Sequence, residues 1–109
     1  MTVFVSGYSG LVRDILLENA KRPGIRFSVI VTESRPKCEG YKLCEILAKN
    51  DIQVKLILDS AIAIALEDAD FVLDGAEAVV ENGGIINRLG TYTTSLCAKS
   101  LNKPFYVVS

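Results

Sequence analysis

The chain of 109 residues contains no histidine and only three cysteines. Without histidine it has no imidazole ligand for zinc or haem, no Ser-His or Cys-His dyad and no histidine general base. The spacing of the cysteines, Cys38, Cys44 and Cys97, matches neither a CxxC redox pair nor a four-ligand metal site. We therefore expect no metal site, no cofactor, and reduced thiols that pack as small apolar groups.

The chain also lacks an excess of either charge and any long hydrophobic run. Twelve lysines and arginines face thirteen aspartates and glutamates, so the formal net charge is −1 and no global attraction to nucleic acid or to an anionic membrane is expected. The longest apolar run, Ala61 to Leu66, is far below the ~20 residues of a membrane span, and Val3-Phe4-Val5 is too short for the core of a signal peptide. These absences predict a soluble, cytoplasmic protein that holds any charged ligand through local contacts.

Half of the residues are hydrophobic, and their pattern alternates between strands and helices. The alternation favours an α/β domain with a doubly wound, mainly parallel, five-stranded sheet and helices on both faces, of Rossmann-like type. The segment 61–66 is expected to be a helix buried nearly all round and capped by Asp59 or Ser60. The segment 75–90 is expected to be a long irregular loop with one strand-like piece at Ile85-Ile86. Strands are expected at 3–5, 27–31, 54–58, 71–73 and 104–108, and helices at 11–21, 42–49 and 91–101.

Ligands of such sheets bind beyond the carboxyl ends of the strands, where three polar loops are expected to meet: 6–10, 32–36 and 74–91. The first loop could offer backbone amides at a helix N-terminus to an anion, although it lacks the GxGxxG and P-loop patterns and could be only a turn that needs small residues. Arg35 could clamp a phosphate or be a solvated loop arginine. The candidate phosphate-binding residues are Ser6, Gly7, Tyr8, Ser9, Arg35, Asn87 and Arg88.

Four stretches of the chain carry a family resemblance. They are GAEAVVENGGIINRLGT at 75–91, TESRP at 32–36, LDSA at 58–61 and NKPFYVV at 102–108. In order and spacing they resemble the family that contains the regulatory subunits of eukaryotic translation initiation factor 2B, methylthioribose-1-phosphate isomerase and ribose-1,5-bisphosphate isomerase. Within this family, the VVENGGIIN string behind the GAE triplet is most similar to the alpha branch of the regulatory subunits.

The resemblance implies that the site lacks catalytic residues. The isomerases of the family use a cysteine after the first strand and an aspartate in a GAD triplet, and these positions fall on Gly7 and Glu77. The phosphate-handling positions of the family fall on Arg35 and on Asn87 with Arg88. The resemblance therefore implies a chain that is not an enzyme and that keeps the donors of a sugar-phosphate site.

The resemblance also implies a larger context. In this family the sheet domain follows an N-terminal helical domain, so residues 1–109 are expected to be one domain from the C-terminal part of a longer subunit. That subunit would be a non-catalytic regulatory part of the guanine-nucleotide exchange factor for initiation factor 2. Its expected partners are the other initiation factor 2B subunits, a second copy bound through this domain, phosphorylated initiation factor 2, and a sugar phosphate. A sugar-phosphate isomerase relative with an altered site is the alternative, and a nucleotide-binding Rossmann domain is disfavoured by the missing glycine fingerprint.

Overall fold

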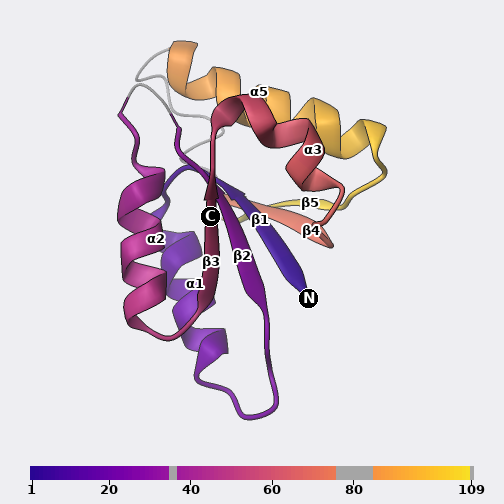
Figure 1. Cartoon of the computed structure of the whole chain (residues 1–109). Coiled ribbons are helices and arrows are strands. Elements are labelled where there is room, and N and C mark those ends of the chain that lie inside the picture. Colours follow the sequence, from indigo (N-terminus) through magenta and orange to yellow (C-terminus); the bar gives the residue numbers. More distant parts are fainter. Residues whose placement is uncertain (35–36, 76–84, 109) are drawn as a thin grey trace.

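Strands and helices alternate along the chain. The computed structural model describes residues 1–34, 37–75 and 85–108, with the backbone alone for 85–92 (Figure 1). The elements, in chain order, are β1 (Thr2–Ser6), α1 (Gly10–Ala20), β2 (Ser28–Thr32), α2 (Gly40–Lys49), β3 (Gln53–Ile57), a 3₁₀ turn η1 (Asp59–Ala61), α3 (Ile62–Leu66), β4 (Phe71–Gly75), α5 (Ile85–Ser100) and β5 (Phe105–Val108).

The five strands form one parallel sheet in the order β3-β2-β1-β4-β5. In the centre of the sheet, Val3 pairs with Val29 of β2 on one side and with Phe71 of β4 on the other. Parallel neighbours need a crossover, and the helices supply it. The strand order and direction confirm the predicted doubly wound α/β fold.

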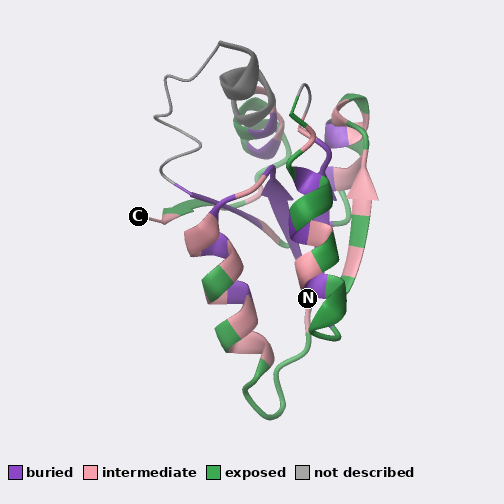
Figure 2. Ribbon diagram, turned by 90° about the vertical axis from the view of Figure 1, so that its left-hand side faces the viewer, coloured by how far each residue is buried: buried purple, intermediate pink, exposed green. Residues whose placement is uncertain are grey.

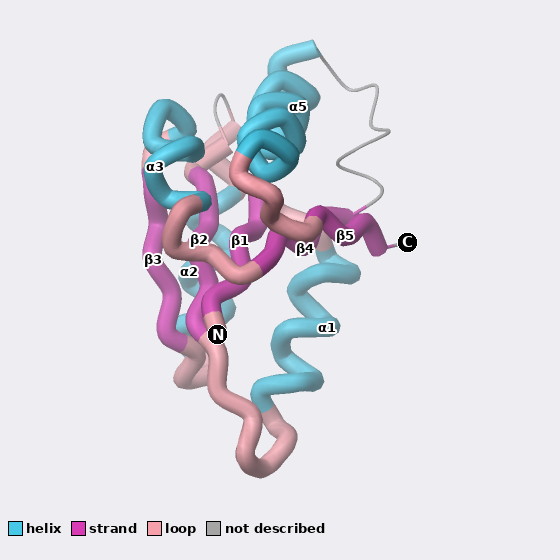
Figure 3. Tube along the Cα trace, turned by 90° about the vertical axis from the view of Figure 1, so that its right-hand side faces the viewer, coloured by secondary structure: helices cyan, strands magenta, loops and turns pink. Residues whose placement is uncertain are grey.

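Helices cover both faces of the sheet. α1 and α2 lie against one face, where Val3, Val5 and Leu43 belong to one core cluster, and α3 and α5 lie against the other, where Phe4 and Val72 belong to a second. The views in Figures 1 and 3 show these two layers, and Figure 2 shows buried residues on the central strands and on the inward sides of the helices. Successive residues of β1 point to opposite faces, which is why the central strands are apolar throughout. In the part of the chain that the structure describes, no helix is long and apolar enough to cross a membrane.

The segment before the last helix differs from its prediction. α5 begins at Ile85, so the strand-like piece at Ile85-Ile86 and the helix start at residue 91 were wrong. Gly90 is inside the helix, because one glycine costs a helix only about 1 kcal/mol and does not end it. The predicted loop at 75–90 was wrong at both ends, because Gly75 is the last residue of β4 and residues 85–90 lie in α5. The rest of that segment, residues 76–84, lies outside the described residues.

The segment 59–66 is also less buried than predicted. It forms a 3₁₀ turn followed by a short helix, in which Ile62 and Leu66 face the core while Ile64 is 74% exposed. The prediction of a helix buried nearly all round was wrong, because Ile62 and Leu66 are four residues apart and lie on one face, away from Ile64. The predicted caps, Asp59 and Ser60, were also wrong. The N-cap of η1 is Leu58 and that of α3 is Ala61, neither with a side-chain cap, and Asp59 instead accepts a hydrogen bond from the amide of Ser34.

Candidate functional site

The order of the strands reverses between β1 and β4, so the crevice at their carboxyl ends is where a doubly wound sheet binds ligands. Two residues join these strand ends. The amide of Ser6 donates to Oδ1 of Asp74 at 3.0 Å, and the Ser6 hydroxyl donates to Oδ2 of Asp74 at 2.6 Å. The two central strands are thus tied together by a carboxylate at the place where a ligand is expected.

Asp74 is buried, with 1% of its surface exposed. Burial raises the pKa of its carboxyl group to about 6, although the two hydrogen bonds from Ser6 act to lower it. From the sequence, Asp74 was predicted only as the start of a loop and was missed as a site residue. An acidic residue directly after the apolar run Phe71-Val72-Leu73, at the carboxyl end of a buried strand, is the signal that could have identified it.

The turn between β1 and α1 is shaped by Gly7. Its φ of +84° lies in the region that favours glycine, and its amide donates to Oγ1 of Thr32 at 3.1 Å. A Cβ at this position would lie 2.8 Å from Oγ of Ser34. Within the turn, the amides of Ser6 and Gly7 and the Ser6 hydroxyl therefore already bind Asp74 and Thr32, so the later part of the turn has to supply the donors for an anion.

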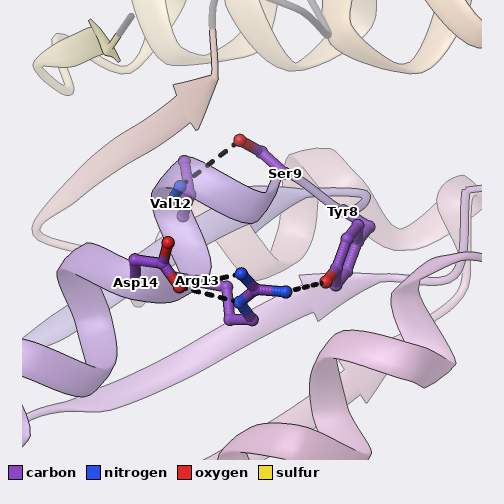
Figure 4. A network of polar contacts seen from close by, with 5 residues as sticks. All are labelled: Tyr8, Ser9, Val12, Arg13 and Asp14. Carbon is purple, nitrogen blue, oxygen red and sulfur yellow. Dashed lines mark hydrogen bonds and ion pairs between the residues drawn. The ribbon is translucent and has the colours of Figure 1, made fainter.

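Tyr8 and Ser9 have separate structural roles in the same turn (Figure 4). Ser9 is the N-cap of α1, and its hydroxyl oxygen accepts from the amide of Val12. The Tyr8 hydroxyl accepts a hydrogen bond of 2.6 Å from Arg13, which also pairs with Asp14. The Nζ of Lys42 lies 4.7 Å from the centre of the Tyr8 ring, within the range of a cation–π contact. Tyr8 is thus held between the first turns of α1 and α2.

The loop after β2 lies beside this turn. Oγ1 of Thr32 and Oγ of Ser34 are 3.1 Å apart and form a hydrogen bond in which either hydroxyl can be the donor. The Ser34 amide donates to Oδ1 of Asp59 at 2.9 Å. Ser34 has a positive φ of 58° and Cys38 one of 53°. At the end of the loop, the backbone of Gly40 packs directly against β2. Any other residue would place its Cβ 1.9 Å from the backbone oxygen of Thr32, so this position requires glycine. Arg35, the predicted clamp, lies outside the described residues.

Asn87 and Arg88 lie in the first turn of α5. This helix follows β4 and leads to the start of the parallel β5, so its first turn is at the same edge of the sheet as the ends of β1 and β2 (Figure 1). The structure does not describe these two side chains, and Glu77 lies outside the described residues. Among the residues that are described, no three Cys, Asp or Glu side chains are grouped as a metal site would need.

The carboxyl edge of the sheet therefore carries hydroxyl groups and the two buried acidic residues Asp74 and Glu33, the contents of a site for a polar small molecule. A family model, described as the initiation factor 2 subunit family, matches residues 1–109. The chain belongs to the initiation factor 2 subunit family. The resemblance found in the sequence is thereby confirmed for the whole chain.

Individual relatives agree with this assignment. The chain is 50% identical over all 109 residues to the translation initiation factor eIF2B subunit alpha of Dictyostelium discoideum, which confirms the resemblance to the alpha branch. It is 37% identical over 94 residues, 86% of its length, to the ribose 1,5-bisphosphate isomerase of Archaeoglobus fulgidus. The chain spans 34% of the first relative and 30% of the second, about a third of each.

A solved structure confirms the fold within the initiation factor 2 subunit family. The crystal structure of the translation initiation factor eIF-2B from Pyrococcus horikoshii OT3 matches 97% of this chain with a TM-score of 0.83 and 29% sequence identity. The match covers 38% of the Pyrococcus chain. The doubly wound sheet and its carboxyl edge are therefore features that the chain shares with a solved family member.

Proposed function

We propose that this chain is the C-terminal sheet domain of a non-catalytic regulatory subunit of the guanine-nucleotide exchange factor for translation initiation factor 2. The full subunit would carry an N-terminal helical domain, act in the cytoplasm, and take part in complex assembly and in sensing phosphorylated initiation factor 2. The main support is the 50% identity to a relative named as the alpha subunit of eIF2B. Its proposed partners are other initiation factor 2B subunits and a second copy, bound through this domain.

The observation that carries the non-catalytic part of this proposal is the geometry at Gly7. The isomerases resembled by this sequence place a cysteine here, whereas this chain has a glycine with a φ of +84° and with Ser34 2.8 Å from its missing Cβ. Both the backbone and the neighbouring hydroxyl oppose a side chain at this position. Position 7 therefore carries no thiol, and a side chain there would require the Ser34 hydroxyl to turn away.

What remains is a site suited to binding. We infer that a sugar phosphate binds beyond the strand ends, with its phosphate held by the later part of the turn, at Tyr8 and Ser9, by Arg35 and by Asn87 with Arg88. Helix α1 begins directly after this turn, and the N-terminus of a helix favours an anion. The hydroxyl groups of Thr32 and Ser34 add neutral hydrogen-bonding groups beside it.

Reconstitution tests the proposed assembly. The full subunit that contains this chain is expected to co-purify with the other subunits of the exchange factor, and the 109-residue chain is expected to sediment as a dimer at high concentration. A chain that stays monomeric at every concentration contradicts self-association through this domain, and a full subunit that never enters the complex contradicts the regulatory role.

A sugar-phosphate isomerase is the second candidate, and Asp74 favours it. A buried carboxyl group with a pKa of about 6 at the ligand crevice is poised to exchange protons near neutral pH, and one relative is an isomerase at 37% identity. An assay with ribose 1,5-bisphosphate and with methylthioribose 1-phosphate distinguishes the two candidates. We expect no rate above background, and a clear rate that Asp74→Asn abolishes would establish the isomerase.

A further inference from the structure

The loop between α1 and β2 is basic, although the chain as a whole is not. The segment 19–32 contains three cationic residues, Lys21, Arg22 and Arg26, and no acidic residue. All three lie in the loop itself, residues 21–26, which is called the basic loop below. The formal net charge of the whole chain is −1, so this concentration of positive charge is local and attracts an anionic partner to one place.

The basic loop is exposed along its whole length. All six of its residues are exposed, and Figure 2 shows it in green at the end of the molecule opposite the proposed sugar-phosphate site. Lys21 forms an ion pair with Glu18 at 3.7 Å, on the surface. Arg22 and Arg26 form no ion pair with any residue that the structure describes. Their guanidinium groups are therefore available to a partner.

A tight turn fixes the shape of the basic loop. The amide of Ile25 donates to the carbonyl oxygen of Arg22 at 3.4 Å, and Gly24 has a φ of +81°. Proline followed by glycine at the two central positions, with a positive φ at the glycine, is typical of a type II turn. Ile25, 38% exposed, is thus held between Arg22 and Arg26 in the sequence. A loop that is already ordered loses less conformational freedom when it binds.

We propose that the basic loop binds an acidic segment of a protein partner, in which an apolar residue is flanked by aspartates or glutamates. The planar guanidinium of arginine matches the two oxygens of a carboxylate. Ile25 offers an apolar contact to the residue between those carboxylates. The loop is at the opposite edge of the sheet from the proposed sugar-phosphate site, so this binding is a separate activity beyond the function proposed above.

Two other anionic partners fit the basic loop less well. Proteins that bind nucleic acid through its backbone commonly make six to ten phosphate contacts, and clusters that bind anionic lipids commonly have four to eight lysines and arginines. The basic loop has three cations, one of them paired with Glu18. An exposed isoleucine also gains nothing from a phosphate backbone. The number of charges and the apolar residue together favour a short acidic peptide.

The experiment measures the fluorescence anisotropy of a labelled peptide that has one leucine between two runs of three glutamates. It compares the wild-type chain with the double variant Arg22→Gln/Arg26→Gln and with Lys55→Gln/Lys99→Gln, a matched control that removes the same charge from exposed positions on β3 and α5. We expect the arginine variant to bind about tenfold more weakly at low salt, since two exposed charge pairs are lost. The control is expected to match the wild type, and Ile25→Ser to bind about threefold more weakly.

Each of the other outcomes overturns the proposal. An arginine variant that binds the peptide as well as the wild type, or no worse than the lysine control, shows that the basic loop is not the binding surface. Tighter binding of a single-stranded RNA oligonucleotide or of phosphatidylserine vesicles through the same arginines gives the loop a different class of partner. A wild-type chain that binds none of these probes has no such surface, whereas the sugar-phosphate site and the regulatory role are judged by their own tests.

Discussion

At both the amino edge and the carboxyl edge of the sheet, an aspartate links the β4 region to β1, but the two aspartates lie in different surroundings. At each edge an aspartate of the β4 region accepts a hydrogen bond from a β1 amide 68 residues earlier in the chain: Asp70 from Thr2 at 2.7 Å, and Asp74 from Ser6 at 3.0 Å. The Asp70 contact at the amino edge is exposed to solvent, whereas Asp74 at the carboxyl edge is 1% exposed and has a raised pKa. The carboxyl edge thus buries a charge that the amino edge leaves in water.

Backbone strain follows the same division. Asp51 and Asn102 have positive φ angles just after the ends of α2 and α5, where left-handed residues commonly terminate helices. Ser34 and Cys38 have positive φ angles in a loop between a strand and a helix, where no helix end requires them. The positive φ angles at the amino edge are thus explained by the way helices end. Those at the carboxyl edge have no such explanation, and strained backbone of this kind is expected where a protein binds a ligand.

Gly40→Ala is expected to have the largest effect. The new Cβ would lie 1.9 Å from the backbone oxygen of Thr32, so α2 must move. The unfolding free energy should fall by about 3 kcal/mol, the upper end of the usual cost of overpacking. Gly10→Ala is the matched control, because Gly10 begins α1 and its Cβ would lie 3.7 Å from the nearest atom, Nη2 of Arg13. Urea denaturation measures both. Equal losses would show that the start of α2 is not closely packed against β2.

The pH dependence of stability separates Asp74 from Asp70. The folded pKa of Asp74 is about 6 against an ordinary value of 3.8, so the folded state binds a proton more tightly than the unfolded state. This group therefore stabilises the fold less as the pH rises from about 4 to about 7, by about 3 kcal/mol in total. Asp74→Asn is expected to remove that decline, and Asp70→Asn at the exposed edge to leave it in place. Parallel curves for wild type and Asp74→Asn would contradict the burial of a titrating carboxyl group.

Gly7→Ala is expected to cost about 2 kcal/mol, the strain of a positive φ plus the contact with Ser34. Gly24→Ala is the control, because Gly24 has a φ of +81° with nothing within 4 Å of its Cβ, and it should cost about 1 kcal/mol from the backbone alone. Thermal unfolding compares the two. Combining Gly7→Ala with Ser34→Ala should recover the difference, and no recovery would mean that Ser34 does not occupy that space.

Arg35→Ala tests the predicted clamp and is the smallest of these effects. Loss of a charge-assisted contact to phosphate should weaken ribose 5-phosphate binding about tenfold, which corresponds to ~1.4 kcal/mol. Arg22→Ala, in the exposed turn that follows α1, is the control and should leave the affinity unchanged. Equal affinities for wild type and Arg35→Ala would make Arg35 a solvated loop residue.

More of the fold than of the site could be predicted from the sequence. Apolar strands alternating with amphipathic segments predicted the parallel sheet, because burial on both faces dictates that pattern. The start of α5 was missed because the glycines and polar residues before residue 91 look like a loop, and a helix tolerates Gly90. The bond from Ser6 to Asp74, the bond from the Ser34 amide to Asp59 and the position of Ser34 over Gly7 could not be predicted. Each joins segments that only the fold brings together.

The central claim is that the carboxyl edge of the sheet binds a sugar phosphate without isomerising it. The most direct test is an NMR titration of the ¹⁵N-labelled chain with ¹³C-labelled ribose 1,5-bisphosphate. The account predicts saturable shifts of the amides around Gly7, Tyr8 and Ser34, none at Thr2 or Ser28, and a ligand spectrum that remains that of the ribose compound. Conversion of the ligand to the ribulose isomer, or shifts confined to the amino edge, would contradict it.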